Sequence, residues 1–319
     1  MPLISILVPI YNVEKYLDQC LNSIRFQSFT DFEVICINDG STDRSLDIIN
    51  EFVQKDNRFK LINKKNSGYG HSMNIGLNSC QGTYVGIIES DDYIESDMFE
   101  RLYSIAEKYK LDIVRCNYYK FKKNDKIKEN LEYITSNKII KPINCPEFFF
   151  QAPSIWANLY RNSFLKKYNI SFLETPGASY QDVSFAFKVY ALSEKVMFID
   201  EPLLNYRIDN INSSINSKGK INCVCVEYRE ILNFLKLHPD IYEKIKFHLP
   251  LLRYNCYKWN HLRIDRKFKL SFLKEWQRDT IDDFKEKRIN RKFIHRKELI
   301  NIYIIRYLPS FFKWFKREF

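Results

Sequence analysis

Three short segments of this chain carry side chains that could bind a nucleotide or a metal ion. The first contains Pro9 and Tyr11, the second begins at Asp39, and the third is the acidic run Glu89–Asp92. A carboxylate such as that of Asp39 can accept the ring N–H of a pyrimidine, and the ring of Tyr11 offers a face on which the base can stack. These residue types indicate recognition of a nucleoside.

The acidic run Glu89-Ser90-Asp91-Asp92 needs a counter-charge, because its three carboxylates repel one another. A Mg²⁺ or Mn²⁺ ion shared with a diphosphate would supply it, since such ions bind one or two carboxylates together with phosphate oxygens. The run could instead be a solvated turn that caps a helix beginning near Ser96. The residues alone leave both interpretations open.

Two further loops are also open to two interpretations. The loop from Asn66 to Gly70 precedes a helical pattern and would suit close approach of the backbone to a phosphate, although it could be a simple turn. His71, beside it, is interpreted as a loop histidine rather than a ligand. In the segment from Asp39 to Asp43, turn formation and helix capping account for every residue except Asp39.

The elements that must position these residues alternate between strands and helices. Short apolar runs predict strands at residues 4–8, 32–37, 59–62, 84–88 and 113–116, with helical patterns between them. This alternation predicts an α/β fold with a mainly parallel sheet and helices on both faces. Ligands of such sheets bind at the carboxyl ends of the strands, where the polar segments lie. The charged run 120–129 predicts a loop or hairpin, and Val196–Ile199 and Leu203–Ile208 predict two short strands.

Composition and charge narrow the class of protein. The chain has 319 residues and is 45% hydrophobic, which excludes disorder and collagen-like repeats. Its eight cysteines show no zinc-binding spacing, so we expect free thiols in a reducing compartment. The apolar start is interpreted as a buried strand rather than a signal peptide, and no window predicts a membrane-spanning helix. These features predict a cytoplasmic protein, with contact to the membrane surface left open.

The basic residues are concentrated near the end of the chain, which suggests two domains. Residues 218–319 carry 25 Lys and Arg against 12 Asp and Glu, a balance of +13 within a total of +11. We therefore predict a catalytic domain over 1–217 and a basic helical region over 218–319. The aromatic and basic residues around Trp314 could meet an anionic membrane, or they could pack the last helix onto the protein. A solvated basic surface explains the charge equally well.

Five segments, in order, resemble the family 2 glycosyltransferases, whose nucleotide-sugar-binding fold is called GT-A. They are VPIYNVEKYLDQCLNSIRFQSFTDFEVICINDGSTDRS, NSGYGHSMNIGL, YVGIIESDDYIESDMFERLY, SYQDVSF and LNYRID, and they span about two-thirds of the chain. The resemblance implies a Rossmann-like α/β domain in which Pro9 and Tyr11 line the base pocket and Asp39 binds the base. It also implies that Asp91 and Glu89 bind the metal. The remaining nucleotide-sugar-binding residues are expected to be Asn66, Gly70, Ser90, Asp91 and Arg207.

This chain departs from the family pattern near the diphosphate. Glu89 stands where aspartate is more usual, so we expect its contact with the metal to be longer or mediated by water. Met73 stands where many members have an arginine, so charge compensation must come from Lys64, Lys65, Arg207 or the metal. Arg207 itself could pair with the diphosphate or with an acidic residue.

Asp182 is the candidate catalytic base. Transfer with inversion needs a carboxylate that takes the proton of the acceptor hydroxyl as its oxygen attacks the anomeric carbon. The resemblance implies that the pair Gln181-Asp182 supplies this base. The spacing from Ser179 to Asp182 also matches a helix cap, and both roles can hold. Trp156, with Asn158 and Arg161, could form the floor of the acceptor site, although a core position suits the tryptophan equally well.

These expectations define a metal-dependent inverting glycosyltransferase of the hexosyltransferase type, using Mn²⁺ or Mg²⁺. The favoured donor is a UDP-sugar, and the favoured acceptor is a hydroxyl of a capsule or lipooligosaccharide glycan at the inner membrane face. A sugar nucleotidyltransferase is a rival, but VPIYNVEKY lacks the glycine-rich basic loop that it would use. A nucleic-acid-binding protein using the basic tail is the second rival, and it leaves the acidic strand ends unexplained. We therefore expect no nucleic-acid partner.

Overall fold

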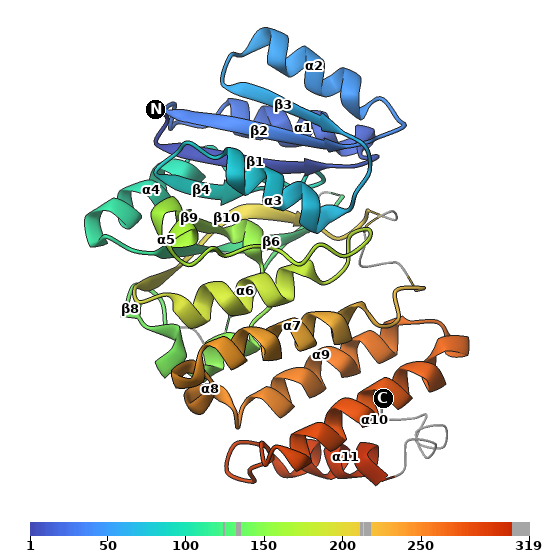
Figure 1. Ribbon diagram of the computed structural model, residues 1–319. Helices are drawn as coiled ribbons and strands as arrows, with labels where there is room; N and C mark the ends of the chain where they lie inside the picture. Colours follow the sequence, from blue (N-terminus) through green and yellow to red (C-terminus); the bar gives the residue numbers. More distant parts are fainter. Residues whose placement is uncertain (124, 132–134, 211–212, 214–217, 308–319) are drawn as a thin grey trace. The chain divides into compact units, whose positions relative to one another are not determined.

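The computed structural model describes residues 1–123, 125–131, 135–210, 213 and 218–307 (Figure 1). The chain divides into two units, Met1–Asn210 and Ile211–Phe319, and each is described by itself. The predicted boundary at residue 217 lies outside the described residues, as does the aromatic segment around Trp314.

The first unit is built on one sheet, which has ten strands among the described residues. The order of its main path is β3-β2-β1-β4-β9-β6-β10-β5, with β7 beside β6 and β8 beside β10. The strands are β1 (Ile4–Ile10), β2 (Phe32–Asp39), β3 (Phe59–Lys64), β4 (Tyr84–Ile87), β5 (Tyr93–Ile94), β6 (Ile113–Lys122), β7 (Asp125–Lys128), β8 (Ile139–Ile140), β9 (Asn158–Arg161) and β10 (Val196–Arg207). The α-helices are α1 (Glu14–Arg25), α2 (Ser45–Lys55), α3 (Tyr69–Ser79), α4 (Met98–Tyr109), α5 (Asn162–Lys167) and α6 (Gln181–Leu192).

Parallel pairing of the first strands confirms the predicted α/β class. β1 runs parallel to β2 and to β4, and β2 runs parallel to β3. The carboxyl ends of these four strands therefore lie along one edge of the sheet. β9 is antiparallel to both of its neighbours, β4 and β6, so the sheet is mixed but mainly parallel.

Alternation along the strands places helices on both faces of the sheet. Ile6 and Val8 of β1 belong to a buried cluster that includes Leu17 of α1 and Leu102 of α4. The intervening residue, Leu7, faces the opposite way, and its side chain contacts Gly76 of α3. Because each strand buries both faces, β1 and β2 read as continuous apolar runs rather than as alternating ones.

The later part of the sheet differs from the prediction in one element. The charged run beginning at Lys120 forms the hairpin of β6 and β7, which was one of the two structures predicted for it. The two short strands predicted between Val196 and Ile208 are one strand, β10, whose register against β6 shifts on either side of Pro202. The shift is expected at proline, which has no N–H to donate to a neighbouring strand.

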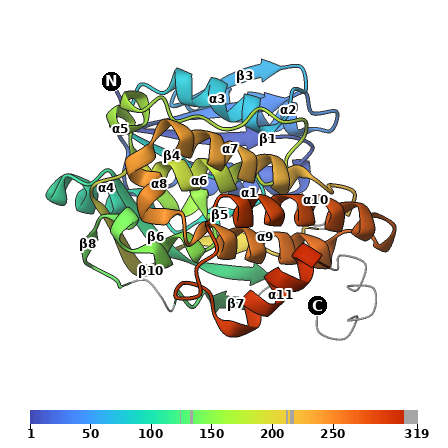
Figure 2. The same cartoon turned by 60° about the horizontal axis from the view of Figure 1, so that its bottom comes forward.

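The second unit is helical in its described part, as predicted for the basic region (Figure 2). Its helices are α7 (Cys223–Leu237), α8 (Pro239–Ile245), α9 (Leu249–Arg263), α10 (Arg266–Lys285) and α11 (Arg296–Tyr307). Buried ion pairs join Asp283 of α10 to Arg253 and to Arg288. All eight cysteines of the chain are free thiols. Among the described residues, no helix combines the length and apolar character that crossing a bilayer requires.

Candidate active site

The loops that follow β1 and β2 are joined by hydrogen bonds at the carboxyl edge of the sheet. Asn12 has a left-handed backbone (φ 49°), and its side-chain oxygen accepts the N–H of Thr42 at 2.8 Å. Its own N–H donates to Ser41 Oγ at 3.1 Å. Pro9 is buried within β1, whereas Tyr11 at the loop is 52% exposed. The ring of Tyr11 is therefore accessible to a ligand, and its backbone is held by the second loop.

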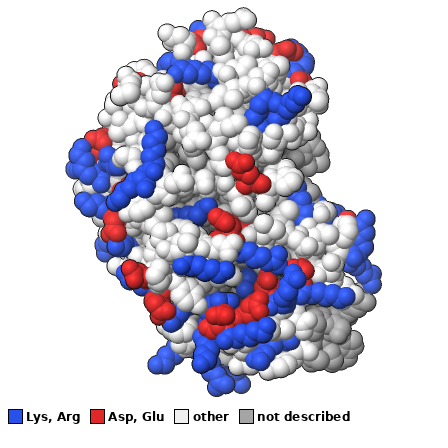
Figure 3. Space-filling view, viewed as in Figure 1, with Lys and Arg blue, Asp and Glu red and all other residues white. Residues whose placement is uncertain are grey.

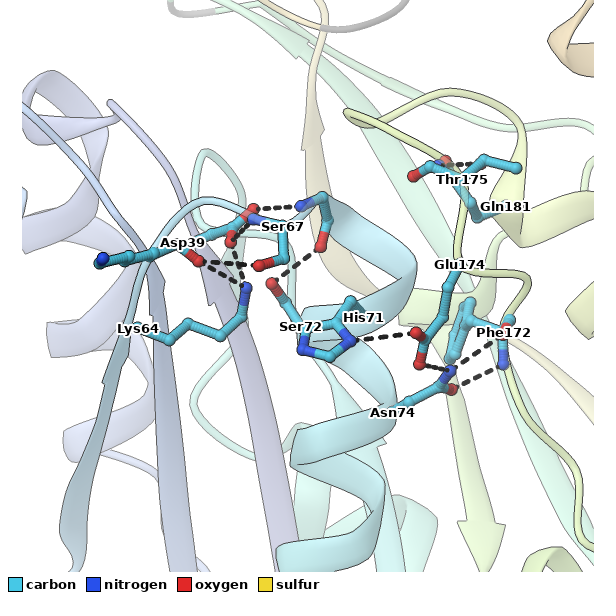
Figure 4. Close-up of polar contacts among 12 residues, drawn as sticks. Asp39, Lys64, Ser67, His71, Ser72, Asn74, Phe172, Glu174, Thr175 and Gln181 are labelled. Atoms are coloured by element: carbon cyan, nitrogen blue, oxygen red, sulfur yellow. Dashed lines mark hydrogen bonds and ion pairs between the residues drawn. The ribbon is translucent and has the colours of Figure 1, made fainter.

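Asp39, at the end of β2, holds the loop that follows β3. Its carboxylate accepts the backbone N–H groups of Ser67 at 2.8 Å and Gly68 at 3.0 Å, and it pairs with Lys64 (Figure 4). Because a carboxylate has about four acceptor positions, a further bond to a ligand is chemically possible. The positive charge of Lys64 is already paired here, so Lys64 is a poor candidate for neutralising a diphosphate.

The glycines predicted to approach a phosphate lie close to the protein's own backbone. A Cβ atom at Gly70 would overlap the carbonyl of Leu173, and Gly68 has a left-handed backbone (φ 93°). The N–H of Tyr69 donates to the carbonyl of Gly177 at 3.0 Å. This packing explains the need for glycine without any ligand. Asn66, in the same loop, packs its backbone closely against Gly40.

Side chains strengthen the contact between α3 and the segment 172–177, as Figure 4 shows. The amide of Asn74 donates to the carbonyl of Phe172 at 3.0 Å and accepts its N–H at 2.8 Å. Glu174 lies 3.0 Å from His71 Nδ1 and 2.9 Å from Asn74 Nδ2. His71 therefore lies on the helix and pairs with a carboxylate. We call this set of contacts, from Tyr69 to Asn74 and from Phe172 to Gly177, the α3 seam.

Glu89, the first acid after β4, is held by a residue that the sequence did not single out. The hydroxyl of Tyr69 donates to Glu89 Oε1 at 2.6 Å. Burial, together with the nearby charges of Asp91 and Asp182, raises the pKa of Glu89 to about 8, although the hydrogen bond from Tyr69 lowers it. Glu89 therefore lies close to two other carboxyl groups, those of Asp91 and Asp182.

Asp91 and Asp92 are fixed by the end of β10. Asp91 Oδ2 accepts from the side chain of Asn210 at 2.7 Å, and Asp92 Oδ1 accepts the N–H of Arg207 at 2.7 Å. Burial raises the pKa of both carboxyl groups. Asp92 Oδ2 is buried and has no hydrogen-bond partner among the described residues. Ser90, between the acids, is also buried.

Arg207 is occupied by contacts within the protein. Its side chain is buried, and it donates to the carbonyl of Asp91 at 2.8 Å and to Gln19 Oε1 at 2.6 Å. Its remaining terminal nitrogen lies 3.7 Å from Asp209. The acidic partner predicted for Arg207 is therefore Asp209, and the pairing of Arg207 with a diphosphate stays a prediction. The hydrogen bonds to Asp91 and Gln19 use two of the five N–H donors of the guanidinium.

Asp182 lies in the first turn of α6, as predicted, but the predicted cap by Ser179 is wrong. The helix begins at Gln181 after Tyr180, which has a left-handed backbone (φ 65°), and no side chain caps it. Ser179 Oγ is buried without a partner among the described residues. Burial raises the pKa of Asp182 to about 6, although backbone N–H groups at the helix start lower it. The helix terminus alone would have kept this pKa low, and burial outweighs it.

The four acidic residues come together around Tyr206, near the end of β10. Burial raises the pKa of the Tyr206 hydroxyl, and four carboxylates then raise it further, in the order Asp92, Asp91, Asp182 and Glu89. The fold thus brings the acidic run close to Asp182, which lies about ninety positions later in the chain. Nothing in the local sequence pattern of Tyr206 indicated this role.

The tryptophan considered for the acceptor site lies beside this tyrosine. The rings of Trp156 and Tyr206 are stacked, with centroids 5.0 Å apart and planes within 6°. The side chains of Asn158 and Arg161 make their contacts with other residues. Asn158 is buried and bonded to Ser154 and Tyr190, whereas Arg161 bonds to the carbonyl of Leu111 and the hydroxyl of Tyr84. Only Trp156 remains a candidate of this group.

The carboxylates fit a hard divalent cation that is shared with a ligand. Within the described ranges, no group of three or more His, Cys, Asp or Glu side chains is arranged to hold a metal alone. Glu89 and Asp91 nevertheless supply the oxygen ligands that Mg²⁺ and Mn²⁺ prefer, and these ions often bind one or two carboxylates plus phosphate. The pKa values of Glu89 and Asp91 are raised, and one oxygen of Asp92 has no partner among the described residues, so a cation here would stabilise the ionised carboxylates.

Comparisons with known proteins agree with this geometry. The chain is 34% identical over 219 residues to the uncharacterized glycosyltransferase EpsJ of Bacillus subtilis (strain 168), covering 67% of this chain and 63% of EpsJ. It therefore matches less than two-thirds of that relative's length. Its fold resembles that of Staphylococcus aureus TarS 1–349 in complex with UDP-GlcNAc, with a TM-score of 0.72, 20% identity and coverage of 96% of this chain and 87% of TarS.

A more distant structure has the same fold. The mannosyltransferase PcManGT of Pyrobaculum calidifontis, in complex with GDP-Man and Mn²⁺, aligns with a TM-score of 0.52 at 12% identity, over 99% of this chain and 88% of that one. Residues 5–168 match the model of "Glycosyl transferase family 2". That match covers the strand ends of β1, β2 and β4 and the acidic run. The chain belongs to glycosyltransferase family 2 and has the GT-A fold.

Proposed function

We propose that this protein is a metal-dependent inverting glycosyltransferase that moves a sugar from a UDP-sugar to a hydroxyl of a surface glycan. The observation that carries the proposal is the meeting of Asp182 with the acidic run around Tyr206. One carboxylate with a pKa of about 6 then lies near two others suited to a metal-bound diphosphate. Family membership and the TarS–UDP-GlcNAc likeness support the same class of reaction.

Asp182 acts as the general base in this proposal. Its carboxylate accepts the proton of the acceptor hydroxyl while that oxygen forms a bond to the anomeric carbon. The bond from the anomeric carbon to the diphosphate oxygen breaks on the opposite face, so the configuration inverts and the nucleoside diphosphate leaves with the bonding electrons. A base with a pKa of about 6 is ionised at neutral pH and still basic enough to take a proton.

The donor is bound across the carboxyl edge of the sheet. Tyr11, exposed beside Pro9, stacks on the base, and Asp39 accepts the base N–H with its remaining acceptor capacity. Ser90, Asn66 and Gly70 stay predicted contacts of the nucleotide-sugar. Arg207, which also donates to the carbonyl of Asp91 within the acidic run, stays a predicted contact of the nucleotide-sugar.

Asp91, together with Glu89, would hold Mn²⁺ or Mg²⁺, and Tyr69 fixes the orientation of Glu89. The ion supplies positive charge against the departing diphosphate. The Mn²⁺ bound in PcManGT supports this assignment. The protein's own part is to hold the two carboxylates in place by the contacts to Tyr69 and Asn210.

We further propose a capsule or lipooligosaccharide acceptor and a location on the cytoplasmic side of the membrane. The eight free thiols support a reducing compartment. Trp156, stacked on Tyr206 near Asp182, is our candidate for contact with the acceptor sugar.

Calorimetric titration of UDP and of GDP with Mn²⁺ tests the donor site. We expect UDP to bind, EDTA to weaken that binding at least tenfold, and Asp91→Ala to do the same. Asp200→Ala, which removes an exposed carboxylate at another part of β10, is the matched control and should bind normally. Absence of binding by either nucleotide would refute the donor site. Metal-independent binding unchanged in Asp91→Ala would refute the metal assignment alone.

A further inference from the structure

The outward face of α11 carries apolar side chains that the other described residues leave exposed. Ile302 and Ile305 of this helix are buried at 3% and 0%, so one face packs inside the second unit. On another face, Ile300 is 50% exposed and Tyr307 is 62% exposed. Together with Leu299, Tyr303 and Ile304, these two residues line a hollow of about 680 Å³. The spacing 300, 303, 304 and 307 forms a single stripe along the helix.

Two arginines line the same hollow and have no ion-pair partner among the described residues. Arg291 and Arg296 are both exposed, as are the neighbouring Lys292 and Lys297. Between residues 291 and 307 the sequence has five basic residues and a single acid, Glu298. Figure 3 shows Lys and Arg side chains numerous over the C-terminal helices on the face it presents, with acidic side chains among them. An apolar stripe beside unpaired arginines is the composition of a surface that binds anionic lipid.

Charge distinguishes between the possible occupants of this face. Residues 308–319 are aromatic, but they carry Lys313, Lys316 and Arg317 against Glu318 alone, so they would bring positive charge to the arginines. A second copy of the chain, with a net charge of +11, is repelled in the same way. A nucleic acid would pair with the arginines but would gain little from an aliphatic stripe. An anionic bilayer complements both the arginines and the stripe.

We propose that the outward face of α11 docks the protein on an anionic phospholipid bilayer. Arg291 and Arg296 contact the lipid phosphates, while Ile300, Ile304 and Tyr307 enter the boundary between head groups and acyl chains. The helix lies in the plane of the surface and does not cross it. This inference does not depend on the proposed chemistry of the first unit.

Co-sedimentation with vesicles tests the proposal, using the full-length protein. We expect binding to vesicles of equal parts phosphatidylcholine and phosphatidylglycerol, little binding to phosphatidylcholine alone, and weakening by salt. Arg291→Gln with Arg296→Gln should weaken partitioning about thirtyfold. Ile300→Ser should weaken it about tenfold.

Matched control variants lie in the first unit. Lys55→Gln with Lys108→Gln makes the same charge change at exposed positions, and Ile127→Ser replaces an isoleucine that is 68% exposed. Both controls should bind vesicles within about twofold of the unchanged protein. Circular dichroism of every variant checks that the fold is intact.

Several results would overturn the proposal. Failure of the unchanged protein to bind anionic vesicles is one, and equal binding to both kinds of vesicle is another. If the arginine variant loses binding and Ile300→Ser does not, the face would bind a polyanion such as nucleic acid rather than a bilayer. Loss caused by Phe312→Ser with Trp314→Ser, while the α11 variants bind normally, would assign the membrane contact to the last residues of the chain instead.

Discussion

Replacing Asp182 by asparagine tests the proposed base, because the change keeps the size of the side chain and removes both its negative charge and its ability to take a proton. The backbone N–H groups at the start of α6 can still bond to the amide oxygen of asparagine. The neighbouring acids of the run are untouched. Removing a general base typically lowers the rate by about 10²–10⁴-fold, and we expect kcat to fall within that range.

The structure also predicts the pH dependence of the unchanged enzyme. With the pKa of Asp182 at about 6, about a tenth of this carboxyl group is ionised at pH 5, against about nine-tenths at pH 7. The value of kcat/KM should therefore rise about tenfold between pH 5 and pH 7 and level off above it. In Asp182→Asn the residual activity should lack this rise.

The effect of the same substitution on stability has the opposite sign to its effect on rate. Burial disfavours the ionised form, so the folded pKa of Asp182 lies above the ordinary value of 3.8. This carboxylate therefore costs stability progressively as pH rises from about 4 to 6, and the cost is complete at pH 7. Raising this pKa from 3.8 to about 6 lowers the free energy of unfolding by at most about 3 kcal/mol. Asparagine never ionises, so Asp182→Asn should raise Tm by roughly 2–8 °C at pH 7.5.

The assay pairs release of nucleoside diphosphate with differential scanning fluorimetry on the same samples. Asp200→Asn, which alters an exposed carboxylate paired with Lys128 at 2.7 Å, is the control and should change kcat less than twofold. The reasoning is refuted if Asp182→Asn keeps more than about a tenth of the activity. It is also refuted if its Tm falls by several degrees, since the loss of rate would then follow from a damaged fold.

Three other substitutions test the metal site and the packing of the loop that follows β3. Asp91→Asn should abolish the effect of Mn²⁺ on UDP binding, measured by calorimetry with and without EDTA, and normal metal dependence would contradict the assignment. Tyr69→Phe removes the 2.6 Å hydrogen bond that orients Glu89, so the affinity for Mn²⁺ in the presence of UDP should fall about tenfold. An unchanged affinity for Mn²⁺ would show that this hydrogen bond is dispensable. Gly70→Ala places a Cβ against a backbone carbonyl and should lower Tm by several degrees in thermal unfolding. The control is Gly219→Ala, where a Cβ meets open space and Tm should stay nearly unchanged. Equal effects of the two substitutions on Tm would contradict the packing argument.

The strands whose carboxyl ends form this edge could be predicted because their signals are local. Runs such as Ile4–Val8 and Phe32–Ile37 are apolar on both faces, which is the pattern of a strand buried within a parallel sheet. Each ends in the polar residues that the edge presents. The acidic run was found in the same way, from its position after an apolar strand, whereas Asp182 was identified through the resemblance to the family.

The contacts that organise the site could not be predicted in this way, because they join distant parts of the chain. Arg207 contacts Gln19 and Asp91, and Tyr206 lies near three acids of the run Glu89–Asp92, which is more than a hundred residues away in the chain. Local spacing also misled in one case. Ser179 has the right separation from Asp182 for a cap, but the left-handed backbone of Tyr180 starts the helix one residue later than that cap requires.

The glycines of the loop after β3 illustrate the same limit. Gly70 follows the pattern of a phosphate-binding turn, yet the atom that excludes a side chain there is the carbonyl of Leu173. A local sequence window cannot distinguish a ligand from a distant part of the same chain, since either can demand glycine.

The α3 seam has a consequence for engineering. Tyr69 and Asn74 belong to the half of the domain whose strand ends are proposed to bind the donor, whereas Phe172 and Gly177 lead into the helix that carries Asp182. The two halves are thus not interchangeable modules, because several of the bonds between them depend on side chains. A chimaera that combines the donor half of one enzyme with the acceptor half of another must transplant both sides of the seam together. Recombination libraries of this family should place their crossovers accordingly.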